Sequence, residues 1–134
     1  MTDKSEFKAV ARELKAIFKP HLKKLVVVSE SETGIYLNTN VVMKNKHPMF
    51  FGAVRIGKAY VSFHLMPLYC FPELSKAMSP ALRKRMQGKA CLNFTVVDKN
   101  LFKELKELTK LGADKFLSKE FVSTVLGGDF KKAS

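Results

Sequence analysis

Five side chains of this sequence belong to the types that ligate soft metal ions or pair a nucleophile with its base: His21, His47, His64, Cys70 and Cys91. No two of them stand at HxxxH, HExxH or CxxC spacing, the patterns that place two ligands together on one helix or turn. A Cys91–His64 pair on neighbouring strands could form a nucleophile and base, but no carboxylate is evident to orient the imidazole. The sequence therefore predicts no metal site, no cofactor and no enzymatic activity, although spacing alone does not test a site assembled from remote positions.

Positive charge dominates the chain and concentrates in its middle. The 134 residues include 24 basic and 12 acidic ones, for a net charge of +12. Between Lys44 and Lys89, nine basic residues face the single carboxylate of Glu73, so this stretch alone carries +8. Five of these cations are the candidate anion- or phosphate-binding residues: Lys58, Arg83, Lys84, Arg85 and Lys89. They either attract an anion through charge and guanidinium forks or only keep the protein soluble.

Alternation of apolar and polar residues predicts which side chains share a sheet face. Strand side chains point alternately to opposite faces, so the apolar members of each run are expected against the helices. These are Ile35, Leu37, Val61, Phe63, Leu65, Leu92, Phe94 and Val96. The opposite face then presents the candidate ligand-binding residues Tyr36, Tyr60, Ser62, His64 and Asn93. Such a face is either plain solvated surface or a ligand site with aromatic rings and convergent polar groups.

The elements that must position these residues follow from hydrophobic periodicity and from end signals. Helices are predicted from near Asp3 to Phe18, over 80–87, from Asp98 to just before Gly112 and, more weakly, over 116–125, with a short helical turn at Pro72. Strands are predicted over 25–29, 34–38, 49–55, 59–66 and 90–96. The segment 38–47 either extends a strand or forms a loop or irregular edge, because asparagines alternate there with apolar residues before Pro48.

Several residues are expected to begin or end these elements. Ser79 before Pro80 is a typical helix N-cap, and Asp3 with Glu6 resembles a capping pair for the first helix. Gly57 is expected to supply a positive φ to the central hairpin turn. Gly88 and Gly112 are each expected to cap the C-terminus of the helix before them.

Together these elements predict an α+β fold. It is a two-layer sandwich in which a roughly five-stranded antiparallel sheet carries the N- and C-terminal helices on one face. The length predicts a single domain over 1–126, followed by a flexible C-terminal tail over 127–134. The longest apolar run, Met49–Val54, is far shorter than a membrane span, and the N-terminal MTDKSEFK lacks the apolar core of a signal peptide. A cytoplasmic protein without membrane contact is therefore expected.

Three stretches of the chain resemble the YdhG-like family of small bacterial and archaeal domains, the domain of unknown function 1801. They are HPMFFGAVRIGKAYVSFHLMP, RMQGKACLNF and DKNLFKELKELTK, and the resemblance covers roughly residues 20–112. It implies a frataxin-like architecture and, from one branch of the family, an iron chaperone. Frataxin-type iron binding uses an acidic ridge, because hard cations favour oxygen donors. Over residues 1–28 this chain instead sets three carboxylates against six lysines and one arginine.

The leading functional prediction is a non-enzymatic binding module for a small anionic ligand or a protein partner. The polar sheet face would be the site, and the cations around Arg83–Lys89 would attract the anionic group at its rim. Two alternatives stay open, a frataxin-like iron or metal chaperone and non-specific binding of nucleic acid through the basic stretch. A homodimer that uses the same face, with Tyr36 and Met66 at its interface, is a further prediction.

Overall fold

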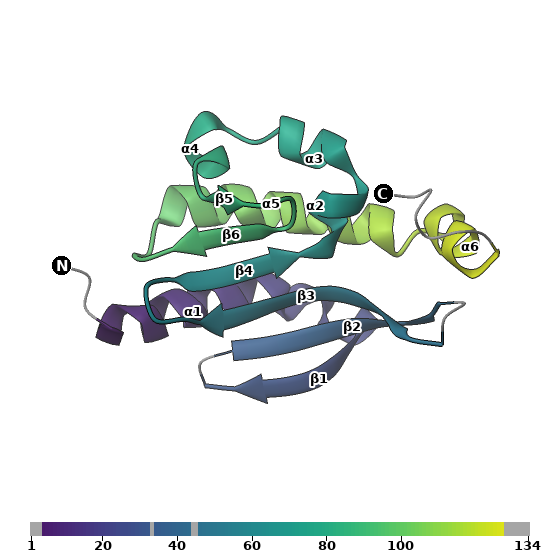
Figure 1. The fold of residues 1–134 in the computed structure, drawn as a ribbon, viewed down its shortest axis with the longest axis horizontal. Helices are drawn as coiled ribbons and strands as arrows, with labels where there is room; N and C mark the ends of the chain where they lie inside the picture. Colours follow the sequence, from purple (N-terminus) through teal and green to yellow (C-terminus); the bar gives the residue numbers. More distant parts are fainter. Residues whose placement is uncertain (1–3, 33, 44–45, 128–134) are drawn as a thin grey trace.

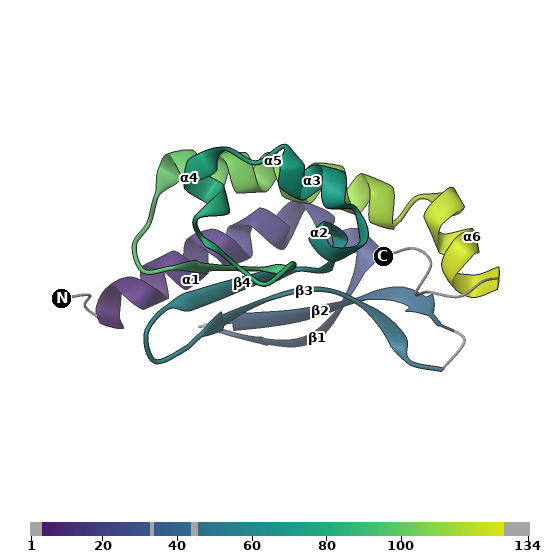
Figure 2. The ribbon, with the colours of Figure 1, turned by 45° about the horizontal axis from the view of Figure 1, so that its top comes forward.

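The computed structural model describes residues 4–32, 34–43 and 46–127. The predicted cap at Asp3 and the predicted tail after Gly127 lie outside the described residues, while Gly127 itself is the last residue of a helix. The described residues form a six-stranded antiparallel sheet with helices on one face, so the α+β two-layer sandwich is confirmed (Figures 1 and 2). In this part of the chain, no helix combines the length and apolar character that crossing a membrane requires.

The sheet is built from two hairpins and a short third pair. Its order is β1-β2-β3-β4-β6-β5, and neighbouring strands run antiparallel throughout. The strands are β1 (Leu25–Ser31), β2 (Gly34–Val42), β3 (Pro48–Ile56), β4 (Val61–Leu65), β5 (Met86–Gln87) and β6 (Cys91–Phe94). Segment 38–47, left open between strand and loop, continues β2 as far as Val42, with an irregular register against β3.

The helical layer covers one face of this sheet. Helices α1 (Lys4–Phe18) and α5 (Lys99–Phe116) lie side by side over it, and α1 runs on into a short 3-10 helix, η1 (Lys19–Lys24) (Figure 2). Three short helices connect β4 to β5: α2 (Met66–Cys70), α3 (Pro72–Lys76) and α4 (Pro80–Arg83). The last helix, α6 (Lys119–Gly127), follows α5.

Aromatic stacking at the centre of the core holds α1 on the sheet. The apolar stripe of α1 ends in Phe18, whose ring stacks on Phe63 with a centroid distance of 4.7 Å and meets Phe51 edge-on at 5.9 Å. Gly52 leaves room for this ring, because a Cβ there would lie 2.7 Å from Phe18 Cζ and 2.7 Å from the carbonyl oxygen of His64. The backbone of β3 therefore approaches both the helix and β4 at a place where no side chain fits.

The predicted parity of the strands is confirmed at the centre of the sheet. The apolar residues predicted to face the helices are buried on β2, β4 and β6: Ile35, Leu37, Val61, Phe63, Leu65, Leu92 and Phe94. Val96 is the exception, since β6 ends at Phe94 and the Val96 side chain is 50% exposed. A two-residue extension of the strand pattern beyond its real end caused that error.

Three predicted glycine roles are wrong. Gly57 has no positive φ; its N–H instead donates to the carbonyl of Tyr60 at 2.8 Å across a longer turn. Gly88 has a φ of 77°, but it turns the chain between β5 and β6 rather than ending a helix. Gly112 lies inside α5, where a Cβ would come within 2.9 Å of Pro67 Cβ. A small residue is needed there for helix packing, which local sequence rules cannot distinguish from capping.

The helix predicted over 80–87 is also wrong in its second half. Helix α4 ends at Arg83, and Met86–Gln87 forms the two-residue edge strand β5, which brings the sheet to six strands. Its predicted start is confirmed, because the Ser79 hydroxyl accepts a hydrogen bond from the N–H of Leu82 at 3.2 Å. The pairing of Met86 with Leu92 supplies ladder contacts that outweigh local helix propensity.

Candidate functional site

The open face of the sheet carries a connected group of polar side chains on β4, β5 and β6. Ser62 lies opposite Asn93 and His64 opposite Cys91 in the ladder, and Gln87 pairs with Cys91 from the edge strand. The Ser62 hydroxyl donates to Asn93 Oδ1 at 3.2 Å, and the Asn93 amide donates to Gln87 Oε1. The Cys91 thiol lies 3.5 Å from Asn93 Oδ1, so these side chains satisfy much of one another's hydrogen bonding.

Cys91 and His64 meet on this face, as the sequence suggested, but in a protonation state unsuited to nucleophilic attack. Their Sγ and Nε2 atoms are 4.0 Å apart. Burial lowers the pKa of His64 and the charge of Arg55 lowers it further. Burial raises the pKa of the Cys91 thiol, an effect partly opposed by the hydrogen bond with Ser62. A neutral thiol beside a neutral imidazole follows at pH 7, rather than a thiolate–imidazolium pair.

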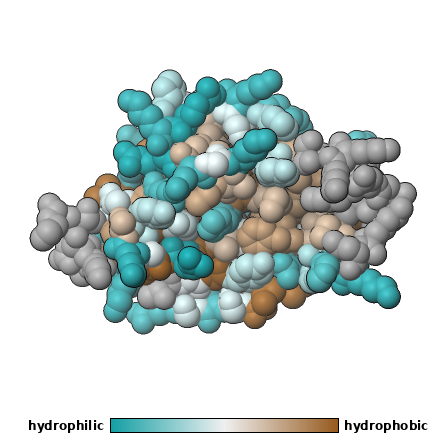
Figure 3. Space-filling view, in the orientation of Figure 1, coloured by the Kyte–Doolittle hydropathy of each residue, from teal (hydrophilic) through white to brown (hydrophobic). Residues whose placement is uncertain are grey.

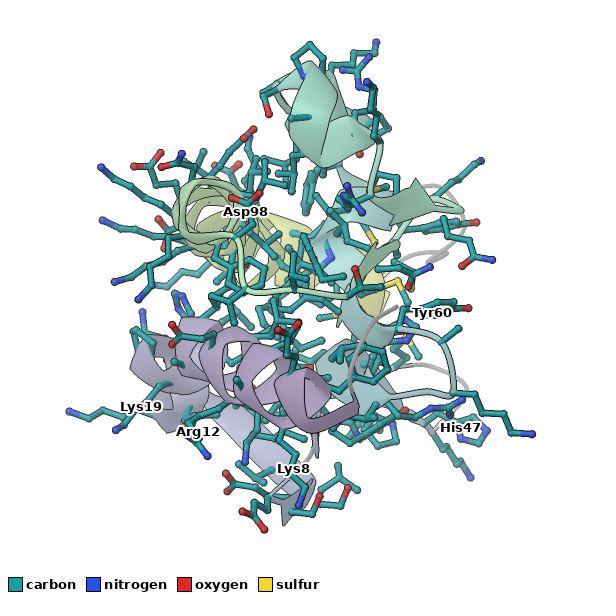
Figure 4. All side chains as sticks on the ribbon, turned by 90° about the vertical axis from the view of Figure 1, so that its left-hand side faces the viewer. Lys8, Arg12, Lys19, His47, Tyr60 and Asp98 are labelled. Carbon is teal, nitrogen blue, oxygen red and sulfur yellow. The ribbon has the colours of Figure 1, made fainter. Side chains whose placement is uncertain are left out.

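The two tyrosines predicted on this face lie at different places along it. Tyr36 on β2 is opposite Ala53, and its ring lies 4.9 Å from that of Phe50. Tyr60 belongs to the β3–β4 turn and points away from the helical layer (Figure 4). Figure 3 shows hydrophobic residues gathered near the middle of the open face, with hydrophilic residues along its upper and lower margins. The predicted ligand-binding residues therefore share one face without converging on one point.

The metal-ligand types remain scattered in the structure. Within residues 4–32, 34–43 and 46–127, no group of three His, Cys, Asp or Glu side chains stands close enough to hold a metal ion. His21 lies in η1, where burial lowers the pKa of its imidazole. Cys70 is buried in α2, and burial raises the pKa of its thiol to about 11. Neither residue adds a ligand to the Cys91–His64 pair.

A groove of about 570 Å³ lies at the β5 edge of the sheet. The elements that line it, α2, α3, α4 and β5, lie around the connection from α3 to α4 (Figure 1). The size of the groove falls within the range of about 300–1,000 Å³ typical of small-molecule sites. Its lining comes from α2, α3, the α3–α4 connection, α4, β5 and the β5–β6 turn: Leu68, Tyr69, Pro72, Ser75, Lys76, Met78, Arg83, Met86, Gly88 and Lys89. Three of these lining residues are basic, and none of them is acidic.

The three cations of the groove differ in their contacts. The Arg83 guanidinium donates through Nη2 to the carbonyls of Ser75 and Lys76, both at 3.1 Å. Lys89 holds its ammonium 5.7 Å from the centroid of the Tyr69 ring, within cation–π range. Lys76 ends α3 and is exposed. Among the described residues, none of the three cations forms an ion pair.

Helix α4, which carries Arg83, is fastened to α5 by one glutamate. Glu104 accepts a hydrogen bond from the Ser79 N–H at 2.7 Å and another from the Ser79 hydroxyl at 2.6 Å. The same hydroxyl caps the first turn of α4. Ser79 thereby fixes the start of α4, and so the place from which Arg83 projects into the groove.

Strand parity at β5 separates the groove from the open face. Met86 pairs with Leu92, which is buried beneath the helices, and Met86 lines the groove. Its neighbour Gln87 pairs with Cys91 and bonds to Asn93 on the open face. Successive strand residues point to opposite faces. Met86 therefore points toward the groove and Gln87 toward the polar side chains of the open face, so β5 separates the two regions.

The predicted anion-binding cations are therefore divided. Arg83 and Lys89 both line the groove, whereas Lys84 does not line it and lies with Arg83 around a smaller hollow of about 360 Å³. Arg85 does not line the groove, and its backbone carbonyl accepts a hydrogen bond from the N–H of Asn93 on β6 at 2.8 Å. Lys58 is exposed in the β3–β4 turn and lines neither cavity.

Sequence reasoning missed Tyr69 and Lys76 as site residues. Tyr69 lies on α2, a helix that was not predicted after β4. The signal was present in Pro67, because proline favours the first turn of a helix. Lys76 lies on the predicted turn at Pro72, but nothing local connects it with Arg83 or Lys89.

The fold and groove define a class, a small α+β sandwich with a basic groove beside its sheet edge. No protein-family model, curated protein or solved structure matches the chain. The resemblance to the YdhG-like family accordingly stays a prediction.

Proposed function

We propose that this protein is a non-enzymatic module that binds a small anionic ligand in the groove between α2, α3, α4 and β5. One observation carries the proposal. Lys76, Arg83 and Lys89 project around a cavity of about 570 Å³ that no acidic residue lines in the part of the chain described. Like charges held together repel one another, and a bound anion relieves that repulsion.

The one carboxylate on α3 is engaged with another lysine. Glu73 lies on α3 with Lys76, and a backbone hydrogen bond, followed by the contact with Lys115 and the charge of Lys76, lowers the pKa of its carboxyl group. Its ion pair is with Lys115 of α5 at 3.4 Å. Glu73 is thus paired with a lysine that does not line the groove, and the groove cations are left to a ligand.

The experiment is a thermal-shift screen of organic and inorganic anions at constant ionic strength. A ligand that binds the folded state raises the melting temperature by mass action, so at least one anion should produce a concentration-dependent rise. The double variant Arg83→Gln/Lys89→Gln should lose that rise. The matched control Arg12→Gln/Lys19→Gln removes one arginine and one lysine from exposed positions on α1 and η1 and should keep it.

Two outcomes contradict the proposal. The first is that no anion shifts the melting temperature of the unaltered protein. The second is that the control variant loses the shift as completely as the groove variant does. The second result indicates general attraction of anions to a protein of charge +12, the behaviour expected for non-specific nucleic-acid binding.

A further inference from the structure

The walls of the groove are more apolar than an inorganic anion requires. Leu68 and Met78 are buried at its base, and Met86 is half-buried against the core. Pro72 and Tyr69 complete the apolar side. A bare anion would leave these surfaces in water, whereas a ligand with an apolar body covers them and gains the corresponding free energy.

The shapes of these side chains favour a flat body. The Tyr69 ring is 41% exposed at the mouth of the groove, where one face is occupied by Lys89 and the remaining surface is available for stacking. Met78 and Met86 are unbranched and polarizable, and thioethers make favourable contacts with aromatic rings. Tyr69, Met78 and Met86 line the same groove, so an aromatic ring bound there contacts side chains that favour aromatic partners.

The arrangement of the cations favours a phosphate group over a carboxylate. Three cations approach from three elements, which suits a group carrying nearly two charges and three acceptor oxygens better than one carrying a single charge. The carbonyls of Ser75 and Lys76 would repel an anion at the end of α3, but both already accept from Arg83. That contact also fixes the guanidinium, so that its remaining donors are aimed with little further loss of entropy.

Resting on the proposed anion-binding function, we infer that the ligand of this groove is a phosphate monoester with a flat, aromatic body. Its phosphate lies among Lys76, Arg83 and Lys89. Its ring lies against Tyr69, Met78 and Met86.

The test is isothermal titration of the full-length protein with four probes: 1-naphthyl phosphate, inorganic phosphate, 1-naphthoate and 1-naphthol. The naphthyl phosphate should bind at least about tenfold more tightly than each of the other three, because only it meets both the cations and the apolar wall. Tyr69→Ala should weaken naphthyl phosphate and leave inorganic phosphate unchanged. Arg83→Gln should weaken both, and Tyr36→Ala, an aromatic truncation on the opposite face, should change neither.

The outcomes separate this inference from the function on which it rests. Equal affinity for inorganic phosphate and naphthyl phosphate, or an unchanged affinity in Tyr69→Ala, overturns the aromatic body and leaves anion binding intact. Preference for naphthoate overturns the phosphate. Binding of naphthol as tightly as naphthyl phosphate overturns the inference and the proposed function together. Circular dichroism of each variant distinguishes lost binding from lost folding.

Discussion

The groove and the open sheet face differ in how their polar groups are satisfied. On the open face, Ser62, Asn93 and Gln87 bond to one another. In the groove, Lys76 and Lys89 have no ion-pair partner among the described residues, and Arg83 is held only by backbone carbonyls. A polar group that already has its partner gains little from a ligand, whereas an unpaired cation in a concave site gains much. Polar residues that share one face of a sheet therefore do not by themselves make a binding site.

The two regions also differ in their support. The open face is one surface of the central sheet, with α1 stacked directly behind it. The groove is built by three short helices at the sheet edge. We expect substitutions beneath the face to affect overall stability most, and substitutions around the groove to affect binding most.

The largest expected effect comes from glycines at the two places. Gly52→Ala should destabilise the protein by about 3 kcal/mol, because its Cβ would meet the His64 carbonyl, which cannot move aside as a side chain can. Gly88→Ala should cost only about 1 kcal/mol, since open space surrounds its Cβ and only the φ of 77° opposes it. Urea denaturation measures both values. Equal losses would remove the distinction between a supported face and a peripheral groove.

Removing either of two helix caps should lower stability, but only removal of the cap beside the groove should weaken binding. Ser79→Ala removes the cap of α4 and the hydroxyl contact with Glu104, at a cost of about 1–2 kcal/mol. It should also weaken 1-naphthyl phosphate, because Arg83 loses its fixed position. Ser118→Ala is the matched control, since the Ser118 hydroxyl accepts from Phe121 N–H at 3.2 Å at the start of α6 and does not line the groove. Calorimetric titration of both variants should show weaker binding in Ser79→Ala alone.

The pH dependence of stability should originate outside the groove, which no histidine lines in the described structure. Burial lowers the folded-state pKa of His64 and of His21 below the ordinary 6.5. The unfolded chain therefore binds more protons than the folded chain as the pH falls through 6.5, and stability decreases with falling pH until the folded-state pKa is passed. The effect should be modest because both rings are only partly buried. Denaturation at pH 5.5 and 7.5 should show a smaller difference in His64→Gln, and an unchanged difference contradicts this account.

The smallest expected effect concerns the thiols. Iodoacetamide should modify Cys91 slowly and Cys70 more slowly still, because burial raises both pKa values and that of Cys70 reaches about 11. Both rates should increase with pH, as peptide mass spectrometry after timed quenching can measure. Alkylated Cys91 should leave the affinity for 1-naphthyl phosphate unchanged, since Gln87 and Met86 direct the two regions to opposite sides of β5. A loss of affinity on alkylation indicates that face and groove are coupled.

Much of the fold was predictable because its signals are local. The stripe of α1, the alternation in β4 and the caps at Ser79 and Asp98 each depend on residues within one or two turns of the chain. The same rules failed at Gly112 and at Met86. The role of Gly112 depends on its close approach to Pro67, and the role of Met86 depends on its pairing with Leu92. Neither contact can be recognised from the residues next to it in the sequence.

The sequence by itself determined the excess of positive charge, the two-layer α+β architecture and the alternation that places His64, Ser62 and Asn93 on one face. Tertiary structure alone decided that Tyr69, Lys76, Arg83 and Lys89 meet around one cavity, while Lys58 and Lys84 lie outside it. The physical reason is that strand and helix periodicity assign a side chain to a face within its own element. Which elements then enclose a cavity depends on non-local packing, here the approach of α5 to Pro67 and the bond of Glu104 to Ser79.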